Sequence, residues 1–156
     1  MNTPEYRFSI EEVAALLAIS GRKDLAKGIL LSNFGELSPD EERGRLLAAN
    51  HSLYVHGHIS IRGEQQEISP EMSHLLSAFA NPKRTLRAGK SGSFGEDLRI
   101  FFYSEGSWTE NAVQDGVIFS FQPERSLEEI EASIIAFFSP VFLGWRASDP
   151  VILPET

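Results

Sequence analysis

The sequence has no cysteine among its 156 residues, which excludes disulfide bonds, thiolate metal ligands and a cysteine nucleophile. No apolar run approaches the length of about 18 residues that a membrane-spanning helix needs. The N-terminal residues lack the apolar stretch of a secretion signal. Together these absences predict a cytoplasmic protein that does not enter a membrane.

Basic residues are also scarce. The 14 Lys and Arg are outnumbered by 22 Asp and Glu, which gives a formal net charge of −8. Proteins that bind nucleic acid usually carry the opposite sign, because neutralising phosphates supplies most of their non-specific affinity. The charge balance therefore argues against a general nucleic-acid binder, although a local basic patch is compatible with it.

The residue spacings of known catalytic and cofactor sites are missing as well. The Gly-Lys-Ser sequence at 89–91 resembles the end of a phosphate-binding loop, but Arg84 stands where that motif needs glycine. His51, His56 and His58 do not have the i, i+4 spacing that puts two metal ligands on one helix face. We therefore predict no catalytic residue, no cofactor and no metal site, and a protein that is not an enzyme.

What the sequence does contain is enough apolar residues for one core, since 42% of the chain is hydrophobic and eleven residues are phenylalanine. A chain of this length fits a single domain. We expect an α+β fold in three parts: a mainly helical part at 9–82, an antiparallel meander plus helix at 83–140, and an apolar extension at 141–156 that packs on the domain or on a partner.

Three Ser-x-x-Glu capping boxes predict where helices begin. They are Ser9 with Glu12, Ser38 with Glu41, and Ser126 with Glu129. Gly21 and Gly57 are predicted to end the first two helices, and Ser139-Pro140 the third. Residues 1–8 read as a polar lead, and residues 22–31 fit either a short helix or a strand, which periodicity does not separate.

Residues 38–82 read as a helix, a two-stranded ribbon over 59–68, and a second helix that Asn81-Pro82 ends. On the first of these helices, five side chains fall on one face: Leu46, Leu47, Asn50, Leu53 and Tyr54. The unit is winged-helix-like, which makes a DNA-binding regulator the alternative function. The acidic first turn of the long helix disfavours DNA reading, because DNA-reading helices usually expose Arg, Lys, Asn or Gln.

From Arg84 onward the hydrophobic period changes to two, which predicts an antiparallel meander. The expected strands are Arg84–Ala88, Leu98–Ser104, Trp108–Val113 and Val117–Phe121. The stretch 98–103 is apolar on both faces apart from Arg99, so it should be central and covered on both sides. Residues 89–95, which are rich in glycine and serine, are expected to be the most flexible stretch.

Apolar and turn residues in this order resemble a known family. The order runs Leu53, Gly57-His58-Ile59, Ile68, Pro70, Leu75-Leu76, Pro82-Lys83, Leu86, Val117–Pro123 and Ala136–Pro140. It is similar to one half of the EspG-type chaperones of type VII (ESX) secretion. The resemblance implies a non-enzymatic α+β protein that binds secreted substrate proteins in the cytoplasm.

EspG-type chaperones contain two similar halves related by a pseudo-two-fold axis, and this chain has the length of one half. We therefore predict a homodimer that restores the second half. The expected function is a protein-binding module, chaperone-like or adaptor-like. A DNA-binding regulator and an enzyme of unrecognised type are the alternatives. The candidate partner-binding residues are Lys83, Arg84, Arg87, Ser93, Phe94, Gly95 and Trp145.

Overall fold

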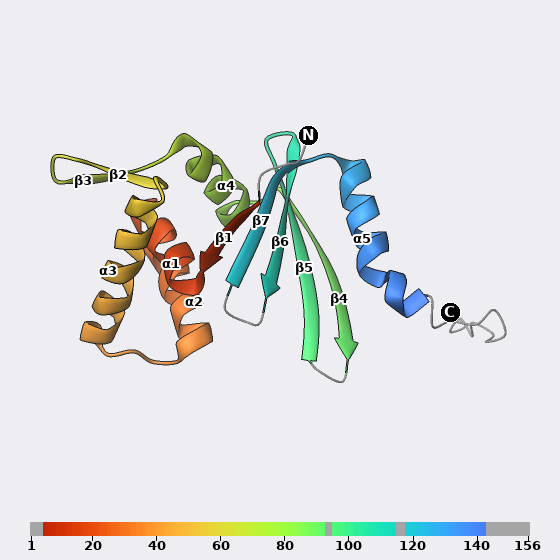
Figure 1. The fold of residues 1–156 in the computed structure, drawn as a ribbon, viewed down its shortest axis with the longest axis horizontal. Helices are drawn as coiled ribbons and strands as arrows, with labels where there is room; N and C mark the ends of the chain where they lie inside the picture. The colour runs from red at the N-terminus through yellow and green to blue at the C-terminus, as the bar shows by residue number, and fades with distance from the viewer. Residues whose placement is uncertain (1–4, 93–94, 115–117, 143–156) are drawn as a thin grey trace.

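The computed structural model describes residues 5–92, 95–114 and 118–142 (Figure 1). The helices are α1 (Ile10–Ile19), α2 (Lys23–Phe34), α3 (Pro39–Val55), α4 (Pro70–Ala80) and α5 (Leu127–Phe142). The strands are β1 (Tyr6–Ser9), β2 (Ile59–Arg62), β3 (Gln65–Ile68), β4 (Arg84–Gly92), β5 (Gly95–Ser104), β6 (Ser107–Gln114) and β7 (Ile118–Arg125). The α+β fold class predicted from the sequence is confirmed.

The main sheet has the strand order β1-β7-β6-β5-β4, and every neighbouring pair is antiparallel. Strands β4 to β7 form the predicted meander, and β2 pairs with β3 as the predicted ribbon. Helices α1 to α4 lie on one side of the sheet and α5 lies on the other (Figure 1). The sheet is therefore the middle layer of three.

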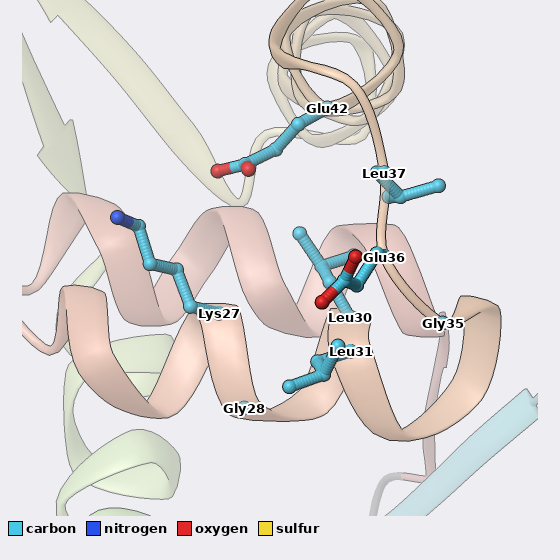
Figure 2. A pocket seen from close by; sticks show the side chains of 8 residues that line it. All are labelled: Lys27, Gly28, Leu30, Leu31, Gly35, Glu36, Leu37 and Glu42. Atoms are coloured by element: carbon cyan, nitrogen blue, oxygen red, sulfur yellow. The ribbon is translucent and has the colours of Figure 1, made fainter.

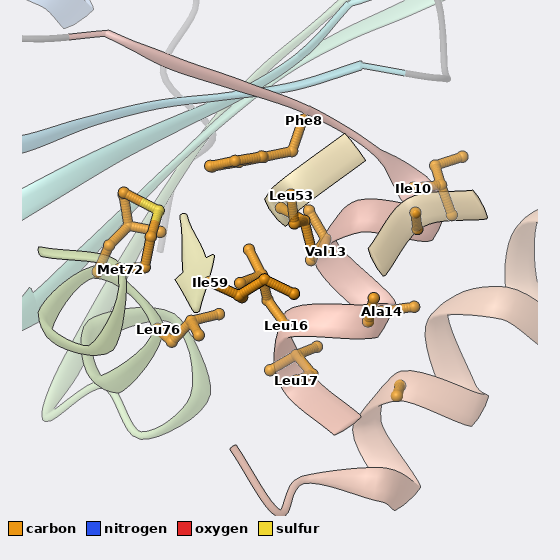
Figure 3. Close-up of a cluster of buried hydrophobic side chains, with 14 of the residues drawn as sticks. Phe8, Ile10, Val13, Ala14, Leu16, Leu17, Leu53, Ile59, Met72 and Leu76 are labelled. Carbon is orange, nitrogen blue, oxygen red and sulfur yellow. The ribbon is translucent and has the colours of Figure 1, made fainter. Parts of the chain in front are cut away.

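The larger core fills the space between α1–α4 and the sheet. Its residues are all less than a tenth exposed and come from α1, α2, α3, α4, β1, β2 and β7. Figure 3 shows Ile59 of the ribbon lying close to Leu16 of α1 and Leu76 of α4. A smaller core lies under α5 and contains Ala88, Phe101, Ile130 and Phe137.

All three capping boxes are present. The Ser9 N–H donates to Glu12 Oε2 at 2.8 Å, and the Glu12 N–H donates to Ser9 Oγ at 3.1 Å. The same reciprocal pairs join Ser38 to Glu41 and Ser126 to Glu129. Each box satisfies two backbone N–H groups that would otherwise lack a partner at the helix start. Gly57 has φ of 75°, the left-handed conformation predicted after α3.

Residues 22–31, left open between helix and strand, belong to helix α2. Ala26 and Leu30 are four residues apart, so both face the core and are 3% exposed. Gly28 lies on the exposed side, with nothing within 4 Å of where a Cβ would stand. This glycine weakens the helix without interrupting it, because packing of the opposite face compensates for its poor propensity.

Two predicted boundaries at the chain ends are wrong. The polar lead at 1–8 contains strand β1, in which Tyr6 pairs with Phe121 and Phe8 with Phe119. Four residues are too few for alternation to separate a strand from a loop. The third helix does not end at Ser139-Pro140 but continues to Phe142. Near the C-terminus a proline removes one helix hydrogen bond and leaves the remaining turns intact.

The stretch expected to be most flexible, 89–95, is mostly β-ladder. The register of β4 with β5 continues from Gly89↔Leu98 to Gly92↔Gly95. Glycine and serine favoured a loop locally, but cross-strand pairing overrides local propensity. The central placement of β5 is confirmed, because Phe101 is 0% exposed on the α5 face and Phe102 is 7% exposed on the other.

The stripe predicted on the long helix divides into two. Leu53 is 0% exposed, whereas Leu47 and Tyr54 are each 54% exposed. We predict that Leu53→Ala lowers the free energy of unfolding by about 2–5 kcal/mol, because it leaves a cavity in the larger core. Leu47→Ala on the same helix should change it by less than about 0.5 kcal/mol. Urea denaturation of both variants provides the check, and equal losses would contradict this description of the core.

Candidate functional site

Strand β4 forms one edge of the main sheet. It has nine residues and pairs only with β5 within the described part of the chain. An edge strand presents a row of backbone N–H and C=O groups that can pair with another strand. The opposite edge, β1, has four residues. We use the name β4 edge for residues 83–92 along the side of β4 that faces away from β5.

Three cations lie on the β4 edge: Lys83, Arg84 and Arg87, all exposed. No carboxylate faces them across the ladder, because Arg84 pairs in register with Tyr103 and Arg87 with Ile100. The Arg84 guanidinium carbon lies 5.9 Å from the centre of the Tyr103 ring. Among the described residues no ion pair neutralises any of the three cations.

Of the other predicted partner-binding residues, the structure describes only Gly95. Gly95 begins β5 and pairs with Gly92 at the end of the ladder. Ser93, Phe94 and Trp145 lie outside the described residues. The structure thus brings Arg84 and Arg87 together on β4, with Lys83 directly before the strand, and extends β4 to Gly92.

An apolar side chain lies among the cations. Leu86 is 42% exposed and pairs in register with Phe101, the centre of the smaller core. Because side chains alternate along a strand, Leu86 shares the α5 face with buried Ala88. Arg87 and Thr85 point to the opposite face. The β4 edge therefore has Leu86 and Ala88 on the α5 face, with Arg84 at its start, and Thr85 and Arg87 on the other face.

A buried charged group lies beneath α5, which sequence reasoning missed. The carboxylate of Glu110 on β6 is 4% exposed and accepts a hydrogen bond from Arg99 of β5. Arg125 Nη1 lies 3.7 Å from the second carboxylate oxygen. The Ser133 hydroxyl of α5 lies 2.9 and 3.0 Å from the two oxygens. We refer to Glu110, Arg99, Arg125 and Ser133 as the Glu110 cluster.

The Glu110 cluster connects strands β5, β6 and β7 to helix α5. Arg125 also donates to the Glu129 carbonyl oxygen in the first turn of α5, at 3.2 Å. The Arg99 guanidinium lies 5.4 Å from the Phe137 ring centre, on the same helix. The cluster therefore fixes α5 on the sheet with charge-assisted bonds. The sequence held one sign of this cluster: Glu110 has the same parity along its strand as the apolar residues Trp108 and Ala112.

Figure 2 shows a pocket of about 350 Å³ between the end of α2 and the start of α3. Leu30, Leu31 and Leu37 contribute its apolar lining, and Lys27, Glu36 and Glu42 carry charge at its margin. In the ranges that the structure describes, no hydrogen bond or ion pair joins these charged groups.

A second pocket, of about 450 Å³, contains charged groups that already serve the fold. Glu12 caps α1 and accepts a hydrogen bond from the Ser52 hydroxyl at 2.7 Å. Glu11 forms an ion pair with Arg45 at 2.7 Å. These contacts fasten α3 to α1, which accounts for the carboxylates there without a catalytic role.

Two histidines meet where α3 joins the ribbon. His56 is exposed at the C-terminal cap of α3, and its ring centre lies 6.2 Å from that of His58. His58 is half-buried and makes an edge contact with Phe8 at 5.2 Å. Across the described residues, no three His, Asp or Glu side chains gather in a way that could hold a metal ion.

No model of a known protein family matches the chain, and a search of curated proteins finds no match either. The resemblance to EspG-type chaperones therefore stays a prediction. None of the described helices combines the length and apolar character that crossing a bilayer requires.

The environment of His58 predicts a pH dependence. Burial lowers the pKa of His58 from its ordinary value of 6.5, and the neighbouring His56 lowers it further, while Glu12 and Glu71 oppose the shift. Below pH 6.5 the unfolded chain therefore binds more protons than the folded chain, so the free energy of unfolding falls as the pH falls. Urea denaturation at a series of pH values measures this slope.

The matched variant is His58→Gln, which should remove part of the slope just below pH 6.5. Hydrogen bonds from serines lower the pKa of three carboxyls from 4.5, namely Glu5, Glu41 and Glu129. Their contribution to stability is lost only below that pH, so the two effects occupy different pH ranges. An unchanged slope between pH 6.5 and 4.5 in His58→Gln would contradict the assignment.

The Glu110 cluster predicts a large effect for a small change. Glu110→Gln leaves Arg99 and Arg125 without their shared anion, and their side chains are 38% and 17% exposed. We expect a loss of about 2–3 kcal/mol in the free energy of unfolding, below the range for a fully buried pair because Arg99 keeps contact with water. Glu11→Gln, at the more exposed pair with Arg45, should cost about 0–1 kcal/mol. Equal losses in urea denaturation would disprove the special role of Glu110.

Proposed function

We propose that this chain is a non-enzymatic protein-binding module whose β4 edge pairs with an extended segment of another protein. The single observation that carries the proposal is the length of β4, since nine residues are bonded on one side only among the described strands. Adding a strand to such an edge is a recurring mode of peptide recognition, in which main-chain hydrogen bonds supply affinity and alternate side chains supply specificity.

The surroundings of the edge support this proposal. Helix α5 covers the smaller core next to β4, and the Glu110 cluster holds that helix in place. A strand added to β4 would therefore join a rigid sheet, which limits the ordering cost of binding. The family resemblance supports the same function, as a cytoplasmic chaperone or adaptor for a secreted protein.

A second copy of this chain is an alternative source of the incoming strand. Pairing of two β4 edges would make a two-fold interface with the same residues on both sides. It would also bring two sets of uncompensated cations together, which costs free energy. We therefore favour a different protein as the main partner, and a homodimer would use another surface.

A photo-cross-linking residue in place of Thr85 on β4 tests the proposal in a lysate of the native host. Thr85 is exposed on the β4 edge, and Ser32 is exposed on α2 and serves as the control position. We expect a discrete adduct with one other protein at Thr85 and none at Ser32, and mass spectrometry should map the adduct to an extended segment.

Two results would contradict the proposal. One is the same adduct pattern at both positions, which would indicate non-specific contact. The other is a salt-sensitive gain in fluorescence anisotropy with duplex DNA and no adduct at Thr85, which would favour the winged-helix regulator.

A further inference from the structure

Because the β4 edge has different chemistry on its two faces, it restricts what can pair with it. The face shared with α5 carries Arg84, Leu86 and Ala88, and the last two adjoin Phe101 of the smaller core. The opposite face carries Thr85 and Arg87. An added strand places its own side chains beside these rows in the same alternation, at cross-strand distances where charges and apolar groups interact.

We infer that the partner segment is an extended strand in which acidic residues alternate with apolar residues. This inference rests on the proposed function. The apolar residues of the segment lie beside Leu86 and extend the smaller core, so the half-exposed leucine becomes buried. The acidic residues lie beside Arg87 on the opposite face. Arg84 lies on the Leu86 face at the start of the strand, beside a further acid at the end of the segment.

The distribution of charge favours an acidic partner segment. Lys83, Arg84 and Arg87 have no carboxylate neighbour among the described residues, in a chain whose formal net charge is −8. Positive charge is therefore concentrated at this edge against an overall negative protein. Opposite charges placed across strands stabilise pairing, and like charges destabilise it, so an acidic strand is selected over a second β4.

Charged side chains on an edge strand have a second role, since they prevent edges from pairing and aggregating. Under that role alone, the cations would repel other copies and bind nothing. The two roles differ in one respect. If the cations only protect the edge, an acidic peptide gains nothing from alternation. If they bind a partner strand, that strand needs acids beside Arg87 on one face and apolar groups beside Leu86 on the other.

Three labelled peptides of nine residues, the length of β4, separate these outcomes. The first alternates Glu with Val, the second has the same composition with all Glu residues grouped together, and the third alternates Lys with Val. Fluorescence anisotropy with the full chain measures the dissociation constants. We expect the alternating acidic peptide to bind at least about tenfold more tightly than either of the others.

Two charge-reversed variants give matched controls. Arg84→Glu/Arg87→Glu should bind the acidic peptide about tenfold more weakly and should gain affinity for the Lys-Val peptide. Arg22→Glu/Lys23→Glu changes the net charge equally at two exposed residues where α2 begins and should leave both affinities unchanged. The gain for the Lys-Val peptide shows that the edge variant is folded and competent.

The inference is overturned if the two acidic peptides bind equally, if neither binds, or if both charge-reversed variants lose affinity alike. It is also overturned if the cross-link at Thr85 joins two copies of this chain. A specific adduct with another protein at Thr85, together with failure of the alternating peptide, leaves the proposed function standing and rejects only the acidic segment.

Discussion

Two adjacent phenylalanines on β5 impose the main constraint on this fold. Phe101 and Phe102 point to opposite faces of the sheet, so both faces of β5 have to be covered. Phe102 contacts Phe79 of α4 at 5.4 Å between ring centres, and Phe101 packs beneath Ile130 and Phe137 of α5. The three layers in Figure 1 follow from this requirement. Since β5 is interior, the strand that enters from α4 becomes the edge.

The two covering layers are of different kinds. On the α1–α4 side, burial of many apolar side chains around Leu16 and Leu53 supplies the stabilisation. On the α5 side the apolar cluster is small, and the Glu110 cluster adds directional contacts that fix the position of the helix. Buried ion pairs contribute less to net stability than to a defined geometry, because desolvation offsets much of their attraction. The position of α5, which covers the smaller core next to β4, thus depends on the polar contacts of the Glu110 cluster.

The sequence predicted local structure better than boundaries or pairings. The capping boxes at Ser9, Ser38 and Ser126 are local signals, and each begins a helix as expected. Strand β1 was missed because its four residues gain their conformation from pairing with β7, which lies more than a hundred residues away. The extension of β4 to Gly92 was missed for the same reason, since only cross-strand bonds hold glycine in a strand.

In the candidate site, too, the sequence predicted local features but not contacts between distant residues. The cations of β4 could be identified from the sequence as a cluster at the start of the meander, but their position on an edge depends on strand order, which no local pattern gives. The Glu110 cluster was missed because its members come from three strands and a helix and meet only in the folded chain.

The central claim is that the outer side of β4 is open in the free protein. Residue-resolved amide hydrogen exchange of the purified chain tests it most directly. We predict alternation along residues 84–92, with slow exchange where the N–H bonds to β5 and fast exchange where it points away. Uniformly slow exchange along β4 would show that the edge is already paired, and it would contradict this account.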